Sequence, residues 1–267
     1  AEEMPWGIPI NISSDPRHSV KSGFESEYIK KKENSQWPEY IGLAATFSAK
    51  VVKNFAEITK LEYRALGITT SLSPQIDLST EPRWSRFKDG FGESTKLSVE
   101  LTRAFCDGIQ TTLNSTSGWG SESVNAMVKH WPGGGAAEAG RDSHFGSGKY
   151  AVYPGENFKE HLLPFTDGAF KLNGLTKKSA AVMPTYAVLW NQDIENHKNV
   201  GSGFNSYLIK TLLRRKNNYE GVVCTDWGII GDEGPLDNMF TGKSWGVEKI
   251  SSSQRCYQAL MVGADQF

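Results

Sequence analysis

The stretch "VKHWPGGG", residues 128–135, shows how a strand ends in this chain and so decides the fold class. A short apolar run stops at a lysine and a histidine, and a proline and three glycines then carry the backbone into a loop. Other short apolar stretches also stop at polar residues; together with 125–133 they are 7–15, 66–78, 179–186, 220–228 and 259–267. The chain therefore predicts about six strands with polar side chains at their carboxyl ends.

Segments with a helical spacing of apolar residues lie between these stretches. Residues 49–67 repeat apolar side chains every three or four positions and end at Gly67, which suits a helix C-cap. Residues 93–110 and 205–219 show the same pattern. Strand and helix thus alternate, which predicts a parallel sheet whose strands are covered on both faces.

Two architectures fit this alternation, a doubly wound sheet and a (β/α)8 barrel. The nucleotide fingerprints that would favour the first are incomplete, because "GGGAAE" (133–138) lacks the last glycine of GxGxxG and "GSGKY" (146–150) lacks a hydroxyl residue after its lysine. Reactive side chains gather instead at strand ends, namely Asp15, Lys129, His130, Tyr186 and Asp226. Because a barrel builds its active site on that face, we predict an α/β fold of the TIM-like barrel type, with about six of the eight strand units in this chain.

The composition argues against several classes of partner. A formal net charge of −1 disfavours electrostatic capture of nucleic acid or of an anionic membrane. No apolar run approaches the roughly 20 residues of a membrane-spanning helix. The three cysteines lie far apart without a CxxC pair, which predicts buried thiols, and we expect neither a metal nor a cofactor. The compartment stays open, with a periplasmic or secreted protein favoured.

Asp226 ends the stretch "GVVCTDW", residues 221–227. Because side chains alternate along a strand, Val222, Cys224 and Asp226 share one face. In a barrel this places a carboxylate at the mouth of the cavity. From spacing alone, Asp226 could be a nucleophile, a metal ligand or the N-cap of the next helix.

Lys129 and His130 are neighbours and point to opposite faces if the strand stays regular. Pro132 and the glycines break the strand at once, which could let both side chains reach one ligand. The alternative is a lysine paired with a nearby aspartate and a histidine satisfied in the barrel wall. Two loops deserve the same scrutiny: 81–93 carries two arginines suited to hydroxyl or carboxylate groups, and 136–165 is a long insertion of the kind that carries function.

Seven pieces of the chain, in order, resemble the barrel domain of glycoside hydrolase family 3. That family includes β-glucosidases, exo-β-glucanases, β-xylosidases and N-acetylglucosaminidases. The resemblance spans nearly the whole chain. The pieces are "GIPINISSDPRH", "YIGLAATFSAKVV", "ALGITTSLSPQIDLSTEPRWSRFKDGFGE", "VKHWPGGG", "VMPTYAV", "FNSYLIKTLLRR" followed by "YEGVVCTDWG", and "ALMVGADQF".

The resemblance implies a role for each candidate. Asp226 in "TDW" corresponds to the nucleophile of a retaining mechanism, and Trp227 would flank the leaving-group side. The residues that would bind the sugar hydroxyls are Lys129 and His130 of "KHW", Asp15 of "SSDPRHS", Arg86 of "EPRWSR", and Tyr186 of "MPTY". The chain departs from the family pattern at Ser19, Glu81 and Ser85, which weakens the local match around Asp15 and Arg86.

The acid/base partner is the open point of the resemblance. In most of the family it is a glutamate on a following α/β-sandwich domain, which would lie beyond Phe267. The N-acetylglucosaminidase branch uses a His-Asp dyad in the loop after the Lys-His pair, and "RDSH" (141–144) offers Asp142 and His144 there. We favour the separate domain. Residues 1–267 would then be a barrel domain truncated at both ends, with two strands expected before Ala1.

These inferences predict a retaining, exo-acting β-glycoside hydrolase. It would release a terminal sugar, glucose being the first candidate, through a glycosyl-aspartate intermediate. Its partners would be an oligosaccharide or β-glycoside substrate and the C-terminal domain of the same protein, and residues 1–267 alone would be inactive or weakly active. The alternatives are a carbohydrate-binding barrel without catalysis and an N-acetylglucosaminidase-type enzyme that uses the dyad.

Overall fold

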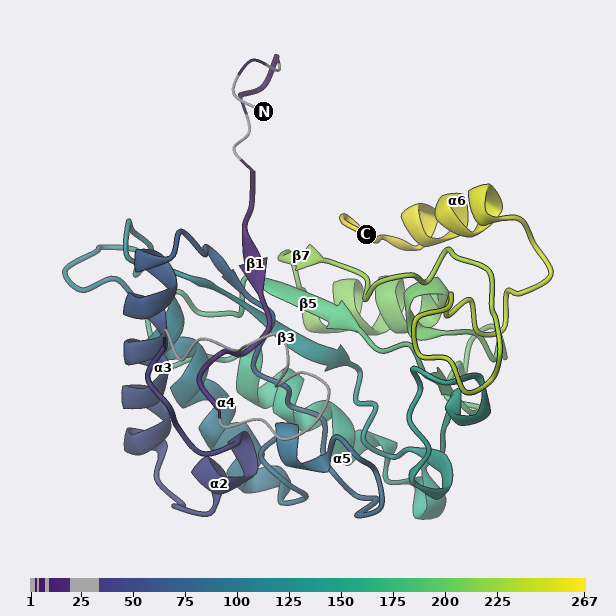
Figure 1. Ribbon diagram of the computed structural model, residues 1–267, viewed down its shortest axis with the longest axis horizontal. Coiled ribbons are helices and arrows are strands. Elements are labelled where there is room, and N and C mark those ends of the chain that lie inside the picture. The colour runs from purple at the N-terminus through teal and green to yellow at the C-terminus, as the bar shows by residue number, and fades with distance from the viewer. Residues whose placement is uncertain (1–2, 4, 8–9, 20–33) are drawn as a thin grey trace.

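The computed structural model describes residues 3, 5–7, 10–19 and 34–267 (Figure 1). Its main sheet has five parallel strands, whose order in space follows their order in the chain. They are β1 (Ser13–Ser14), β2 (Thr70–Ser71), β3 (Asn125–Trp131), β5 (Ala181–Pro184) and β7 (Val222–Val223). A parallel bridge between Cys224 and Gln266 continues the sheet beyond β7.

Helical segments connect consecutive strands of this sheet. The longer ones are α2 (Tyr40–Ala44), α3 (Ala49–Ala65), α4 (Thr95–Gln110), α5 (Phe158–Leu163), the π-helical η5 (Pro164–Ala169) and η7 (Tyr207–Lys216), and α6 (Ser252–Val262). The short 3₁₀ turns are η1 (Phe87–Asp89), η2 (Glu138–Gly140), η3 (Gly146–Gly148), η4 (Pro154–Glu156) and η6 (Ser202–Phe204). A small second sheet pairs β4 (Tyr150–Ala151) with β6 (Val188–Leu189). Figure 1 shows α3 and α4 on the left of the main sheet and α6 on its right.

The predicted helices form where amphipathic spacing and caps coincide. Ser48 caps α3 by accepting a hydrogen bond from the Val51 N–H (3.3 Å), and Ser94 caps α4 in the same way. Gly67 takes a φ of +76° just past α3, a conformation that a glycine adopts without strain. The predictions over 49–67, 93–110 and 205–219 are therefore confirmed within a few residues at each end.

The two faces of the sheet bury different clusters. On β3, Ala126 and Val128 face outward into the large core between sheet and helices, whereas Met127 faces inward. Met127 belongs to a small separate cluster, the interior of the barrel, whose other members are Leu72, Ala181, Met183 and Cys224. Because side chains alternate along a strand, polar residues one step beyond this inner cluster stand at the carboxyl ends of the strands.

The predicted fold class is confirmed. The sheet is parallel, helices cover its outer face, and inner residues form a barrel-type core. Within the described ranges, β1 and the bridge at Gln266 lie at opposite ends of the sheet order and do not pair with each other, so the sheet is open. This is the geometry of part of a barrel.

One predicted strand is wrong in its first half. Residues 259–262 belong to α6, and only Gln266 joins the sheet. A reciprocal capping box between Ser251 and Gln254 starts this helix, and Gly263 ends it with a φ of +117°. A short apolar run such as "ALMV" fits a helix and a strand equally well.

The cysteines are free thiols, with Cys106 and Cys224 buried and Cys256 half-buried. In the part of the chain that the structure describes, no helix has both the length and the apolarity needed to cross a membrane.

Candidate active site

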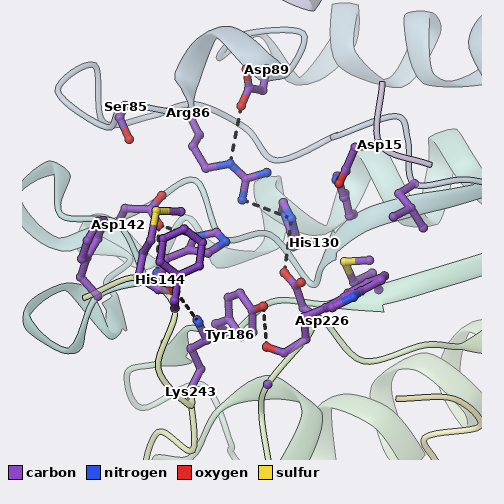
Figure 2. A pocket seen from close by; sticks show the side chains of 18 of the residues that line it. Asp15, Ser85, Arg86, Asp89, His130, Asp142, His144, Tyr186, Asp226 and Lys243 are labelled. Atoms are coloured by element: carbon purple, nitrogen blue, oxygen red, sulfur yellow. Dashed lines mark hydrogen bonds and ion pairs between the residues drawn. The ribbon is translucent and has the colours of Figure 1, made fainter. Parts of the chain in front are cut away.

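A pocket of about 860 Å³ lies at the carboxyl ends of the strands. Leu72 and Met183 of the inner cluster form part of its lining. Every candidate residue from the sequence contributes to it: Asp15, Arg86, Lys129, His130, Asp142, His144, Tyr186, Asp226 and Trp227. Figure 2 shows the labelled side chains among them, such as Asp15, His130 and Asp226, around one space. The residues predicted from strand ends and from the loop 141–144 therefore line one pocket.

Lys129 and His130 both reach this pocket. The peptide bond between them is cis, and the pairing of β3 with β5 shifts register between Lys129 and Trp131. The Lys129 ammonium donates to Asp15 Oδ1 at 2.7 Å, so the expected lysine–aspartate pair exists and forms part of the pocket wall. The ion-pair alternative for Lys129 is therefore observed, and the pair lies in the wall of the pocket.

The glycines after His130 let the loop pass close to Asp77 and Leu78, in the segment that follows β2. A Cβ on Gly135 would lie 2.1 Å from the Leu78 carbonyl oxygen. Gly134 donates its N–H to Asp77 Oδ1 at 2.6 Å. A side chain at position 135 would clash with Leu78, so the loop can fold against this segment because Gly135 carries none.

Asp77 is a residue of the site that the sequence reasoning missed. Its carboxylate is fully buried and lies 2.7 Å from His130 Nδ1, while its other oxygen accepts the His130 backbone N–H at 3.2 Å. Burial alone would raise the pKa of Asp77, but His130, the Gly134 N–H and Arg86 together hold it below its usual value. An aspartate at the end of a predicted strand was the available signal, since Asp77 lies at the end of 66–78.

Arg86 faces His130 from the opposite side. Its Nη1 lies 3.4 Å from His130 Nε2, and its Nε lies 3.5 Å from Asp89 Oδ2 (Figure 2). The same His130 nitrogen is 4.0 Å from Asp226 Oδ2. Burial lowers the pKa of His130, and Asp77 only partly opposes that effect. His130 is thus a neutral imidazole between two carboxylates and a guanidinium.

Asp226 follows β7 and points into the pocket with 13 % of its side chain exposed. It does not cap the next helix, because Ser251 caps α6 with its own side chain. In the described residues, no three His, Cys, Asp or Glu side chains are arranged to hold a metal ion. The structure thus shows Asp226 as a carboxylate that lines the pocket and does not cap α6.

Tyr186 and Lys243 stand beside Asp226. The Tyr186 hydroxyl donates to the Trp227 carbonyl oxygen at 2.7 Å. Burial and the nearby Asp226 charge raise the pKa of Tyr186, so it stays a neutral hydroxyl. Lys243 lies 5.6 Å from the centre of the Tyr186 ring and donates to two backbone carbonyls of its own loop. Nothing in the sequence around Lys243 marked it as part of the site.

Asp142 and His144 form a hydrogen-bonded pair at the pocket wall. Asp142 Oδ1 lies 2.5 Å from His144 Nδ1, and Asp142 Oδ2 accepts the Trp84 indole N–H at 2.7 Å. Burial alone would raise the pKa of Asp142, but His144 and Arg86 hold it well below its usual range. The His144 ring packs edge-on against Tyr186 at 5.0 Å. The dyad suggested by "RDSH" therefore exists as a geometric unit.

The sequence model described as the glycosyl hydrolase family 3 N-terminal domain matches residues 2–266. The chain belongs to glycosyl hydrolase family 3. It is 41 % identical over 281 residues to a periplasmic β-glucosidase/β-xylosidase of Dickeya chrysanthemi, covering 100 % of this chain and 41 % of that protein. It is also 41 % identical to β-glucosidase C of Emericella nidulans, covering 98 % and 40 %.

Solved structures agree on the fold. The β-glucosidase of Listeria innocua in complex with glucose superposes with a TM-score of 0.73 at 23 % identity, over 99 % of this chain and 31 % of that one. A family 3 β-N-acetylglucosaminidase of Paenibacillus sp. str. FPU-7 gives 0.70 at 23 % identity, over 97 % and 42 %. This family 3 chain spans about two fifths of the length of the Dickeya and Emericella relatives.

Two loops of this family 3 chain close one side of the pocket and contact each other. The loop that carries the dyad lies at 136–153, and the loop that carries Lys243 lies at 227–251. The Trp245 indole N–H donates to the Ser143 carbonyl at 2.9 Å, and Lys149 pairs with Glu248 at 3.2 Å. The two walls are therefore one packed unit.

Proposed function

We propose that this family 3 chain is the barrel part of a retaining exo-β-glycosidase, with Asp226 as nucleophile. The observation that carries the proposal is the convergence of Asp226 with hydrogen-bonding side chains from the other strand ends on one pocket. The names of the Dickeya and Emericella relatives support a β-glucosidase or β-xylosidase, and glucose is the first candidate for the released sugar.

The side chains opposite Asp226 suit a terminal sugar ring. Lys129 supplies donors, Asp15 an acceptor and Arg86 a planar fork of donors. His130 and Tyr186 add further polar contacts, and the half-exposed Trp227 offers an aromatic face on the leaving-group side. A buried sugar hydroxyl without a partner costs about 1–3 kcal/mol, so such a set selects a ring with hydroxyls in matching directions.

In the proposed reaction, an Asp226 carboxylate oxygen attacks the anomeric carbon while the bond to the leaving oxygen breaks. A general acid protonates that oxygen as it departs. The same group then takes a proton from water, which attacks the glycosyl ester and frees Asp226. Two displacements at one carbon give net retention of configuration.

We propose that the acid/base is a glutamate on an α/β-sandwich domain that follows residues 1–267 in the complete protein. The greater length of the curated relatives supports such a domain. The hydrogen-bonded Asp142–His144 pair is the alternative acid/base and would make the enzyme resemble the N-acetylglucosaminidase branch.

Covalent trapping tests the nucleophile. A 2-deoxy-2-fluoro β-glycoside with a good leaving group should label the complete protein on the peptide that contains Cys224-Thr225-Asp226. The Asp226→Asn variant should take up no label, whereas the control Asp232→Asn should label as the parent does. Label on Asp232 or Glu233 in the parent protein would overturn the assignment.

A further inference from the structure

His130 lies between two groups of opposite hydrogen-bonding character. On one side, Asp77 Oδ2 is 2.7 Å from Nδ1, and on the other, Arg86 Nη1 is 3.4 Å from Nε2. The Asp77 side chain has no exposed surface, and the His130 side chain is only 5 % exposed. Water therefore has little access to the Asp77 contact, and the neighbours of the ring decide where its proton sits.

The chemistry of these neighbours allows one neutral form of the ring. An ionised carboxylate only accepts hydrogen bonds, so Nδ1 must carry a hydrogen toward Asp77. A guanidinium only donates, so Nε2 must offer a lone pair toward Arg86. Asp226 is 4.0 Å from Nε2, which is too long for a hydrogen bond that would place a second proton there.

We propose that Asp77 is a positioning residue that fixes His130 as the neutral Nδ1–H tautomer, so that Nε2 faces the pocket as an acceptor for a substrate hydroxyl. This role for Nε2 rests on the proposed glycosidase function, but the tautomer itself does not. The Arg86 contact at 3.4 Å is long, so a hydroxyl that donates to Nε2 can replace it.

Both oxygens of Asp77 accept hydrogen bonds, so replacing one oxygen by an amide nitrogen should change the tautomer of His130. Oδ1 accepts two backbone N–H groups, from His130 at 3.2 Å and from Gly134 at 2.6 Å, while Oδ2 serves the imidazole. In Asp77→Asn only one oxygen remains. It must stay with the two backbone donors, so the amide nitrogen faces Nδ1 and requires a bare ring nitrogen there. The proton moves to Nε2, which then opposes Arg86 as donor against donor.

Nitrogen-15 NMR of ring-labelled histidine in the complete protein at neutral pH reads the tautomer directly. The His130 signals are assigned by their loss in a His130→Gln sample. We expect a protonated Nδ1 and a bare Nε2 in the parent protein, and the reverse in Asp77→Asn. The control is Asp107→Asn, because Asp107 also accepts two backbone N–H groups, from Asn173 and Gly174, and has no histidine among its partners in the described part of the chain.

The outcomes separate the tautomer from the proposed function. A protonated Nε2 in the parent protein, or an unchanged Nδ1–H in a folded Asp77→Asn, overturns the proposal. If Asp77→Asn does not fold, the parent spectrum alone still decides it. In an active enzyme, Asp77→Asn should also lower kcat/KM about 10- to 100-fold while Asp107→Asn leaves it near the parent value. A parent protein with the expected tautomer and no glycosidase activity would refute the function and keep the tautomer.

Discussion

Lys129 is almost wholly buried, while the carboxylate of its partner Asp15 stays open to the pocket. Asp15 Oδ1 accepts a hydrogen bond from this buried ammonium at 2.7 Å, which offsets part of the cost of burying the charge. His130 is held in a similar way, because Asp77 lies beside its Nδ1 and Arg86 beside its Nε2. The residues of the site hold one another in place before any ligand arrives.

Replacing Asp15 by alanine should lower kcat/KM of the complete enzyme. The expected loss corresponds to several kcal/mol of transition-state stabilisation. Contacts to sugar hydroxyls strengthen as the ring distorts, and the change also leaves the Lys129 ammonium without its partner. Steady-state kinetics on an aryl β-glucoside measures the loss. A double-mutant cycle with Lys129→Met isolates the part that comes from the broken ion pair. An Asp15→Ala enzyme with unchanged kcat/KM would show that the sugar binds elsewhere.

Among the elements, both ends of the loop 227–251 bind one buried side chain of the helix that follows. Arg255 of α6 is 2 % exposed and donates to the carbonyls of Ile230, Gly231, Val247 and Glu248 and to the Asp232 carboxylate. These acceptors come from both ends of the loop. The helix therefore closes the loop that carries Lys243 as well as extending the sheet.

Arg255→Met should lower the free energy of unfolding by about 2–4 kcal/mol, because several buried carbonyls lose a charged donor. Urea denaturation measures the change. The matched control is Arg64→Met on the exposed side of α3, which should stay within about 0.5 kcal/mol of the parent. Limited proteolysis should cut residues 227–251 faster in Arg255→Met alone. Equal stability of the two variants would mean that the loop is held by other contacts.

The elements also show what the sequence could predict. Helices α3 and α4 were predictable because amphipathic spacing, a serine N-cap and a following glycine or polar residue agree. Helix α6 was not predictable. The short apolar run "ALMV" (259–262) fits a helix and a strand equally well, and the capping box at Ser251 and Gln254 lies before the predicted strand 259–267. At the site, strand-end position found Asp226 and Lys129. It did not single out Asp77, which also ends a predicted strand, because the backbone amides that Asp77 binds are not visible in one sequence. Lys243 lies in a loop and had no such signal.

At the scale of the whole molecule, the order of the strands in the sheet brings the residues of the site together. Five parallel strands in chain order bring their carboxyl ends to one side, and the pocket collects a side chain from nearly every connection. The strand that precedes each residue sets its position in the pocket. No single sequence motif therefore contains the whole site. This explains why the candidates lie far apart in the chain and still share one cavity.

The acid/base can be identified in the complete protein with His144→Ala. If a glutamate on a following domain protonates the leaving group, the variant should keep nearly the parental dependence of rate on leaving-group pKa. Alkyl, nitrophenyl and dinitrophenyl glycosides supply the series. A loss of about 10²–10⁴-fold for poor leaving groups, with dinitrophenyl glycosides spared, would instead make the Asp142–His144 pair the acid/base.

The contact between the two pocket loops has a consequence for protein engineering. The Trp245 indole needs the Ser143 carbonyl, and Lys149 needs Glu248, so each loop supplies partners for the other. A chimera that imports only one loop from a relative would strand a buried indole N–H and an ammonium, whatever sugar contacts the new loop brings. Substrate preference should therefore transfer between relatives only when 136–153 and 227–251 are exchanged as a pair.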